Sequence, residues 1–245
     1  MSPRVTLATG RRVLTQLRRD RRTIALLLAV PSVLLILMRY VFDQDPQVFQ
    51  RVGAPMVGIF PMVSMFLVTS IAMLRERTTG TLERLMTMPL AKLDILAGYS
   101  IGFSLMATVQ ATVASAVAFV LLDLTIAGSA WQVVVLAVLN AILGMALGLF
   151  MSAFANSEFQ AVQFMPAFLL PQILLCGLIA DRDTMAEPLQ WLSDVLPMTY
   201  AYEALHRVAA DGQLGRRGAL DVLVVIGFAV LALLLGAATL RRRTD

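Results

Sequence analysis

The chain has 245 residues, of which 58% are hydrophobic and only 15% charged, and its mean hydropathy is +0.78. A soluble domain of this length carries much more charge, so the composition indicates an integral membrane protein with a formal net charge of +4. The lone Cys176 and the lone His206 exclude an internal disulfide, a multi-cysteine metal site and a histidine cluster.

The first 22 residues are strongly basic and amphipathic. Seven arginines fall between Arg4 and Arg22, and helical spacing places Leu7, Val13 and Leu17 on one arc. This pattern is typical of an interfacial helix whose arginines lie among anionic lipid headgroups. A nucleic-acid arm fits the charge but has no folded surface beside it, so we expect membrane lipid and no nucleic acid as the partner. A cleaved signal peptide is disfavoured, because the next apolar run is as long as a full span.

Six long apolar runs follow, and each is expected to form a transmembrane helix. Their length of about twenty residues matches the hydrocarbon thickness of a bilayer. The expected spans are residues 23–42, 52–74, 98–122, 131–155, 160–180 and 222–240. The prediction is an all-α integral membrane protein in which residues 1–245 form one transmembrane domain.

The segment 75–92 separates the second and third runs and is highly charged. Each of its charges would cost roughly 2.5–3.5 kcal/mol in the middle of a bilayer, so the segment is expected to be a loop at the membrane surface. Gly80 as a cap, with Glu83 three residues later, favours a short amphipathic helix that Pro89 ends.

The segment 181–221 is too polar to cross the membrane. Trp191, Tyr200 and Tyr202 are spaced as interface anchors within it. We therefore expect this segment to form short amphipathic helices on the outer surface, before the last span.

Lysine and arginine are distributed unevenly between the two sides. The first 22 residues hold seven, the segment 75–92 holds four and the C-terminus holds three, against five on the opposite side. By the positive-inside rule, both termini and the segment 75–92 are predicted to be cytoplasmic, and the segment 181–221 external.

The sequence contains no P-loop, no Gly-x-Ser-x-Gly, no His-Glu-x-x-His and no paired cysteines. No catalytic residue, metal site or cofactor is therefore predicted in this chain. Polar and helix-breaking residues within the spans are candidates for a translocation path, with interhelical hydrogen bonding and helix kinking as the alternative roles. These candidates are Gln110, Asn140, Gln163, Pro166, Pro171 and Gln172. Gly144 and Gly148 form a G-x-x-x-G in the fourth run, which favours close helix packing.

The central loop is specific enough to suggest a family. The stretch RERTTGTLERLMTMPL, residues 75–90, resembles the E-x-x-x-G-T-L-E-x-L-x-x-x-P segment of type-2 ABC exporter permeases. That class includes bacterial drug, antibiotic and polysaccharide exporters. The stretch LPMTYAYEALHRV, residues 196–208, is similar to the family's second marker, with His206 before Arg207 as a departure. The number of spans, the orientation and the loop sizes agree with the same family.

The resemblance implies a permease subunit that pairs with a second permease, identical or related, and with two separate ABC ATPase subunits that hold ATP and Mg. It implies outward transport of an amphipathic or lipophilic compound, such as a drug, an antibiotic or a lipid-like molecule, across the bacterial plasma membrane. The coupling residues it implies are Arg75, Glu76, Arg77, Gly80, Thr81, Leu82, Glu83, Arg84, Leu85 and Pro89. The external gate it implies contains Pro197, Tyr200 and Glu203.

Two other classes of function stay open on the sequence. An autonomous channel or secondary carrier needs no partner, but it should show charges within the membrane or a filter sequence. A membrane scaffold predicts no substrate path at all. An ATPase with the missing P-loop, encoded beside this chain, would favour the exporter.

Overall fold

The computed structural model describes residues 3–87 and 92–239, and all regular structure within them is helical. In chain order the elements are α1 (Pro3–Arg19), α2 (Arg21–Val41), α3 (Pro46–Thr78), α4 (Thr81–Thr87), α5 (Lys92–Ala116), the π turn η1 (Val117–Leu121), α6 (Ala130–Met151), α7 (Glu158–Leu175), the 3₁₀ turn η2 (Arg182–Thr184), α8 (Glu187–Val195), α9 (Pro197–Asp211) and α10 (Gly215–Ala238). The all-α prediction is confirmed for these residues.

Five described helices are long and apolar enough to cross a membrane: α2, α3, α5 together with η1, α6 and α10. The sixth expected span corresponds to α7, which is not among the five. Three glutamines, two prolines and Glu158 lower the apolar content of its 18 residues. The multi-span architecture is therefore confirmed, and the count of six stays a prediction.

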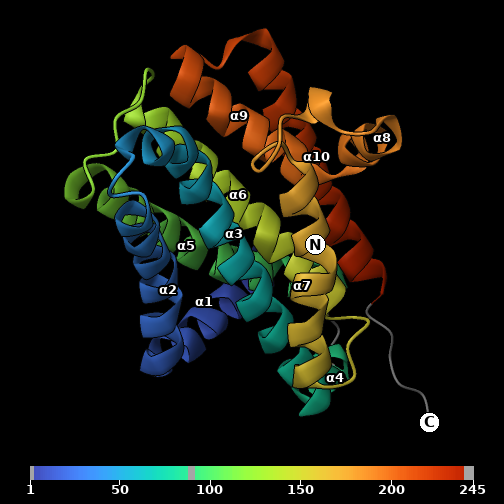
Figure 1. Cartoon of the computed structure of the whole chain (residues 1–245). Helices are drawn as coiled ribbons and strands as arrows, with labels where there is room; N and C mark the ends of the chain where they lie inside the picture. Colours follow the sequence, from blue (N-terminus) through green and yellow to red (C-terminus); the bar gives the residue numbers. More distant parts are fainter. Residues whose placement is uncertain (1–2, 88–91, 240–245) are drawn as a thin grey trace.

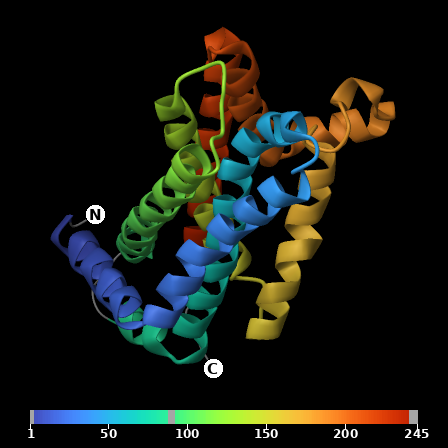
Figure 2. The same ribbon diagram turned by 60° about the vertical axis from the view of Figure 1, so that its left-hand side comes forward.

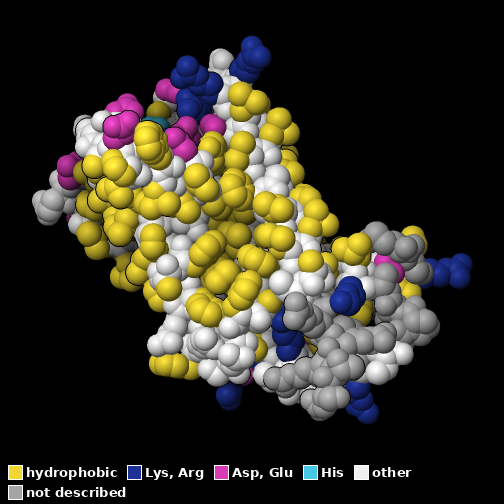
Figure 3. Space-filling view, turned by 90° about the vertical axis from the view of Figure 1, so that its right-hand side faces the viewer, with side chains coloured by type: hydrophobic (Ala, Val, Ile, Leu, Met, Phe, Trp, Pro, Cys, Tyr) yellow, Lys and Arg dark blue, Asp and Glu magenta, His cyan; other side chains and the backbone are white. Residues whose placement is uncertain are grey.

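The helices form a bundle with two distinct ends. Figures 1 and 2 both place α1 and α4 at one end and α8 and α9 at the other, with the long helices running between them. We call the end that contains α1 and α4 the coupling end, and the end that contains α8 and α9 the cap end. A broad band of hydrophobic side chains lies between charged groups on one face of the molecule (Figure 3). This distribution is what a bilayer requires of a protein that crosses it.

Helix α3 is longer than the sequence predicts. It runs for 33 residues, about 50 Å at the rise of an α-helix, and so extends beyond the hydrocarbon at both ends. Arg75, Glu76 and Arg77 belong to its last turns, so their expected position in a loop is wrong. Hydrogen bonding within the helix continues past the first charge, and arginines near the last turn interact favourably with the helix dipole.

Three other span boundaries also differ from the prediction, two by extension and one by shortening of the helix. Helix α5 begins at Lys92, within the expected central loop, and Asp94 lies in its first turn, where an acid is favourable. Helix α10 begins at Gly215, within the expected external segment, and α6 ends at Met151, before the predicted boundary. Hydropathy thus located the apolar middle of each helix, but not its polar ends.

The centre of the bundle is the contact between α3 and α6. A Cβ on Gly144 would lie 2.1 Å from the carbonyl oxygen of Met62, and a Cβ on Gly148 would lie 2.3 Å from that of Phe66. The Thr69 hydroxyl donates across the same contact to the carbonyl oxygen of Met145 at 3.2 Å. Only glycine permits this approach of two backbones, so the packing role predicted for the G-x-x-x-G is confirmed.

We expect Gly144→Ala to destabilise the protein by about 1–3 kcal/mol, because the neighbouring atoms are backbone and cannot move aside cheaply. Gly227→Ala on α10 is the matched control, since nothing lies within 4 Å of its Cβ position. The control should be neutral or stabilising by up to about 1 kcal/mol, through helix propensity. Reversible unfolding in mixed detergent micelles measures both. Equal effects of the two substitutions would contradict the packing account.

Candidate coupling site and membrane cleft

The predicted helix in the central loop is present as α4, Thr81–Thr87. Gly80 ends the preceding turn with φ +70°, a left-handed conformation that favours glycine, and its carbonyl oxygen accepts from the backbone N–H of Arg84 at 3.0 Å. Leu82 is buried, whereas Arg84 is exposed. The side chain of Glu83 and all of Pro89 lie outside the described residues.

Helix α1 is held against the start of α5 by small residues. A Cβ on Gly98 would lie 2.4 Å from the Cβ of Thr9, and a Cβ on Gly102 would lie 2.9 Å from a methyl group of Val13. This close contact keeps α1 across the coupling end of the bundle (Figure 2). The exposed arginines of α1 are then carried on the opposite side of the helix.

Glu76, one of the expected coupling residues, faces α1. Its two carboxylate oxygens accept from Nη2 of Arg12 at 2.9 Å and from Nε2 of Gln16 at 3.2 Å. The Glu76 side chain is only 13% exposed. Its contacts therefore join α1 to the end of α3.

Arg75 also has a partner within the chain. Its Nε and Nη2 donate to the two oxygens of Glu158 at 2.6 and 2.9 Å, which joins α3 to the first turn of α7. Arg77 is half-buried, and its Nε has no hydrogen-bond partner among the described residues. Among the charged coupling residues whose side chains the structure describes, Arg75 and Arg84 are exposed, and Arg75 is paired with Glu158.

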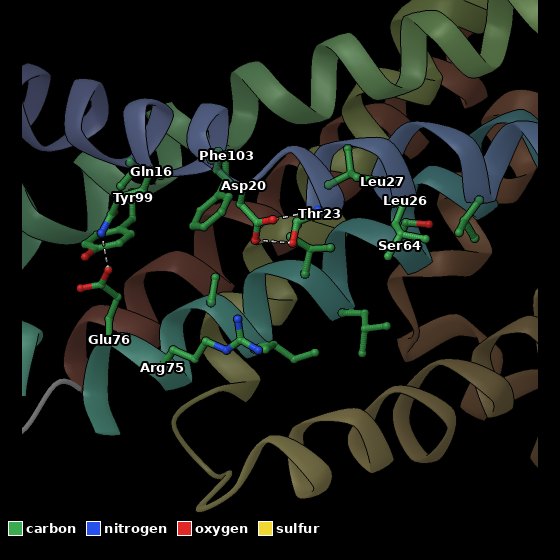
Figure 4. Close-up of a pocket in the computed structure, with 17 residues that line it drawn as sticks. Gln16, Asp20, Thr23, Leu26, Leu27, Ser64, Arg75, Glu76, Tyr99 and Phe103 are labelled. Carbon is green, nitrogen blue, oxygen red and sulfur yellow. Dashed lines mark hydrogen bonds between the residues drawn. The ribbon is translucent and has the colours of Figure 1, made fainter. Parts of the chain in front are cut away.

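A cleft of about 550 Å³ opens between α1, α2, α3 and α5. Figure 4 shows Glu76 with Gln16 and Tyr99 toward one end, Asp20 with Thr23 near the middle, and Ser64 with Leu26 toward the other end. The lining residues are Val13, Gln16, Leu17, Asp20, Thr23, Leu26, Leu27, Val30, Ser64, Leu67, Val68, Ile71, Ala72, Arg75, Glu76, Tyr99 and Phe103. A volume of this size suits a small molecule, since ligand pockets commonly enclose about 300–1,000 Å³.

The six residues predicted to line a path do not line this cleft. Nδ2 of the buried Asn140 is 3.5 Å from the carbonyl oxygen of Ala201, and Gln172 hydrogen-bonds backbone groups of Phe168 and Met198. These two side chains thus form hydrogen bonds within the protein, which is the role predicted as the alternative to lining a path. Gln110 is buried, and neither of its amide atoms has a partner among the described residues.

The remaining three path candidates lie on α7. Gln163 and Pro171 are exposed, and Pro166 is half-buried. The transport role of all six candidates stays a prediction.

The predicted external gate residues lie together at the cap end. Pro197 begins α9, the Tyr200 hydroxyl donates to the carbonyl oxygen of Asp194 at 2.6 Å, and Glu203 accepts from Arg207 at 2.8 Å. Arg182 pairs with both Glu203 and Asp194. Burial works against the charge of Arg182, but the two carboxylates outweigh it and raise the pKa of the guanidinium.

This network continues to the last long helix, because Nε of Arg207 also donates to Oδ2 of Asp221 at 3.3 Å. Ion pairs therefore join η2, α8, α9 and α10 into one unit that covers the cap end. The gate residues take part in this unit, and their role in opening stays a prediction.

Sequence reasoning missed the cleft and the ion pair of Arg12. The residues concerned come from four separate segments, and Arg12 is 64 positions from Glu76. One local signal was present: Asp20 is the lone acid among the first 22 residues and stands three residues before Thr23, as an N-cap does.

Comparison with known proteins agrees with the family resemblance of the central loop. The sequence model of the family described as ABC-2 type transporter matches residues 4–208. The probable multidrug ABC transporter permease YbhR of Escherichia coli is 28% identical over 145 residues, which are 59% of this chain and 39% of that protein. The related permease YbhS is 24% identical over 180 residues, 73% of this chain and 48% of that protein.

A eukaryotic relative is also similar. ABC transporter G family member 20 of Dictyostelium discoideum is 26% identical over 157 residues, 64% of this chain and 22% of that protein. The chain thus matches less than half the length of each of these three relatives.

The Arg12–Glu76 pair should contribute measurably to stability, because both side chains are partly buried, at 32% and 13% exposure. We expect Arg12→Glu and Glu76→Arg each to destabilise the protein by about 1–2 kcal/mol, and the double exchange to recover most of the loss. The same exchange at Arg75 and Glu158, which are 59% and 52% exposed, is the control and should cost less than about 1 kcal/mol. Detergent unfolding of all variants gives the comparison, and the absence of recovery in the double variant would contradict the pairing.

Proposed function

This chain belongs to the ABC-2 type transporter family, and from that premise we propose that it is the permease subunit of an ATP-driven exporter. It is a multi-pass membrane protein whose relatives include probable multidrug permeases. The proposed cargo is an amphipathic or lipophilic compound, such as a drug, an antibiotic or a lipid-like molecule, carried outward across a bacterial plasma membrane. ATP and Mg would bind in a separate ABC ATPase.

The observation that carries this proposal is an exposed, charged helix at the coupling end of a chain that has no nucleotide-binding motif. Helix α4 directly follows α3, and Arg84 on α4 faces outward. Helix α3 extends over 33 residues, so a push on α4 reaches the far side of the membrane through one continuous helix. Coupling requires such a shared element, whose two positions are biased by both sites.

Charge supports a cytoplasmic coupling end. Among the described residues, eleven lysines and arginines belong to α1, the start of α2, the end of α3, α4 and the start of α5. Six lie toward the cap end, counting Arg39 at the end of α2. By the positive-inside rule, the coupling end faces the cytoplasm, where an ATPase could reach α4.

Helix α7 is proposed as the sixth span. Its 18 residues extend about 27 Å, close to the thickness of the hydrocarbon, and it runs from the coupling end toward the cap end in Figure 1. Phe159, Leu170 and Leu174 leave at least half of their surface exposed along it. An apolar, glutamine-bearing helix of this kind suits a contact with a second permease subunit, identical or related, and two ATPase subunits would complete the assembly.

The cap end is the proposed exit gate. Pro197, Tyr200 and Glu203 belong to the ion-paired unit that covers this end, so export requires the unit to move or its bonds to exchange. Pairs that are only partly buried can exchange at modest cost. This property suits a gate that opens in each cycle.

The proposal predicts that the tagged chain co-purifies with an ABC ATPase, and that Arg84→Glu uncouples hydrolysis from transport. Reversal of an exposed charge on α4 should leave ATP hydrolysis in place and lower transport per ATP by about fivefold or more, the usual scale of coupling energies. Reconstituted vesicles that contain the whole complex give both rates.

Arg216→Glu is the matched control, because Arg216 is an equally exposed arginine at the start of α10, toward the cap end. This variant should transport normally. Coupled transport in the Arg84 variant equal to that of the control would overturn the coupling role of α4.

A further inference from the structure

The cleft between α1, α2, α3 and α5 has a polar end and an apolar end. Asp20, Arg75 and Glu76 lie near the start of α2 and the end of α3, whereas Val30 and Ser64 lie about ten to twelve residues away along these helices. At 1.5 Å per residue the cleft reaches about 15 Å, from the headgroup level into the hydrocarbon. Its shape therefore fits an amphipath with its polar group at the membrane surface.

Two of the three charged side chains at the polar end are neutralised by an ion pair, and the third is not. Glu76 is paired with Arg12, and Arg75 is paired with Glu158. Asp20 accepts from the backbone N–H of Thr23 at 3.1 Å and from its hydroxyl at 2.6 Å, and it forms no ion pair within the described part of the chain. The two Thr23 donors hold the pKa of the Asp20 carboxyl below its usual range, and the charge of Arg75 acts in the same direction, so the group is anionic at neutral pH.

A bound phospholipid is the competing occupant. Arg18, Arg19, Arg21 and Arg22 are exposed at this end and attract anionic headgroups, but none of them lines the cleft. A phosphate placed inside it would meet the carboxylate of Asp20, and the cationic side chain among the described lining residues, Arg75, is already paired with Glu158. Charge complementarity therefore favours a cation in this position.

We propose that this cleft binds amphipathic cations from the cytoplasmic leaflet, with the carboxylate of Asp20 facing the positive head and the apolar walls of α2 and α3 holding the body. If the proposed function holds, this cleft is the site at which such cations enter the exporter. The binding of cations in the cleft does not depend on the proposed function. Asp20 has a second role as the N-cap of α2, and asparagine caps a helix equally well. The charge can therefore be removed without loss of the cap.

The test uses the full chain in nanodiscs of zwitterionic lipid, without ATP or ATPase. The probes are three fluorescent alkyl chains that differ only in the head: trimethylammonium, its uncharged tert-butyl isostere, and a sulfonate. Empty nanodiscs correct for partition into lipid. The wild-type chain should prefer the trimethylammonium probe.

Asp20→Asn should weaken binding of the cation by about two- to fivefold, the scale of an exposed ion pair, and leave the tert-butyl probe unchanged. Asp45→Asn is the matched control, since Asp45 is an exposed aspartate at the N-cap of α3, toward the cap end, and it should change neither. Ser64→Phe fills the apolar end and should weaken both probes.

Equal affinity of the Asp20 variant and the wild type for the cation would overturn the role of Asp20. Unchanged binding in the Ser64 variant would place the probes elsewhere and overturn the site. Tightest binding of the sulfonate would make the cleft a lipid-phosphate site instead. Any of these results can occur while ATPase-coupled transport persists, so failure of this inference is distinguishable from failure of the proposed function.

Discussion

The backbone contact between α3 and α6 is the constraint on which the remaining structure depends. At Gly144 and Gly148 the two helices approach so closely that a single methyl group would collide with carbonyl oxygens of α3. Lipid supplies little hydrophobic drive for helices to associate, so packing of this kind has to fix their relative position. It fixes the position of α3, the longest described helix of the bundle, which contains Pro55 and Pro61 in its interior.

The fixed position of α3 also determines how the helices at the coupling end are connected. Helix α4 follows α3 after the short turn of residues 79–80. Helix α1 is attached to α3 by Arg12 and Glu76, and to α5 by the contacts of Gly98 and Gly102. A displacement of α4 therefore reaches both α1 and the cleft that α1 borders. In the proposed transport cycle, coupling to the ATPase and the opening of the cleft would share this one set of contacts.

The all-helical, multi-span architecture could be predicted from the sequence, because the length of an apolar run is a local property. The short helix after Gly80 and the packing role of the G-x-x-x-G were predicted for the same reason. The ends of α3 and α5 were not, since a hydropathy pattern stops at the first charge whereas helical hydrogen bonding continues. The cleft and the partner of Glu76 depend on contacts between distant segments, which no local pattern reports.

The central claim is that this chain forms the passage and that a separate ATPase supplies the work. The most direct measurement is uptake of a lipophilic fluorescent cation into inside-out vesicles that contain the purified chain, with and without its ATPase and with ATP or a non-hydrolysable analogue. The account predicts accumulation against a gradient only when the chain, the ATPase and hydrolysable ATP are all present. Accumulation driven by the chain alone would contradict it.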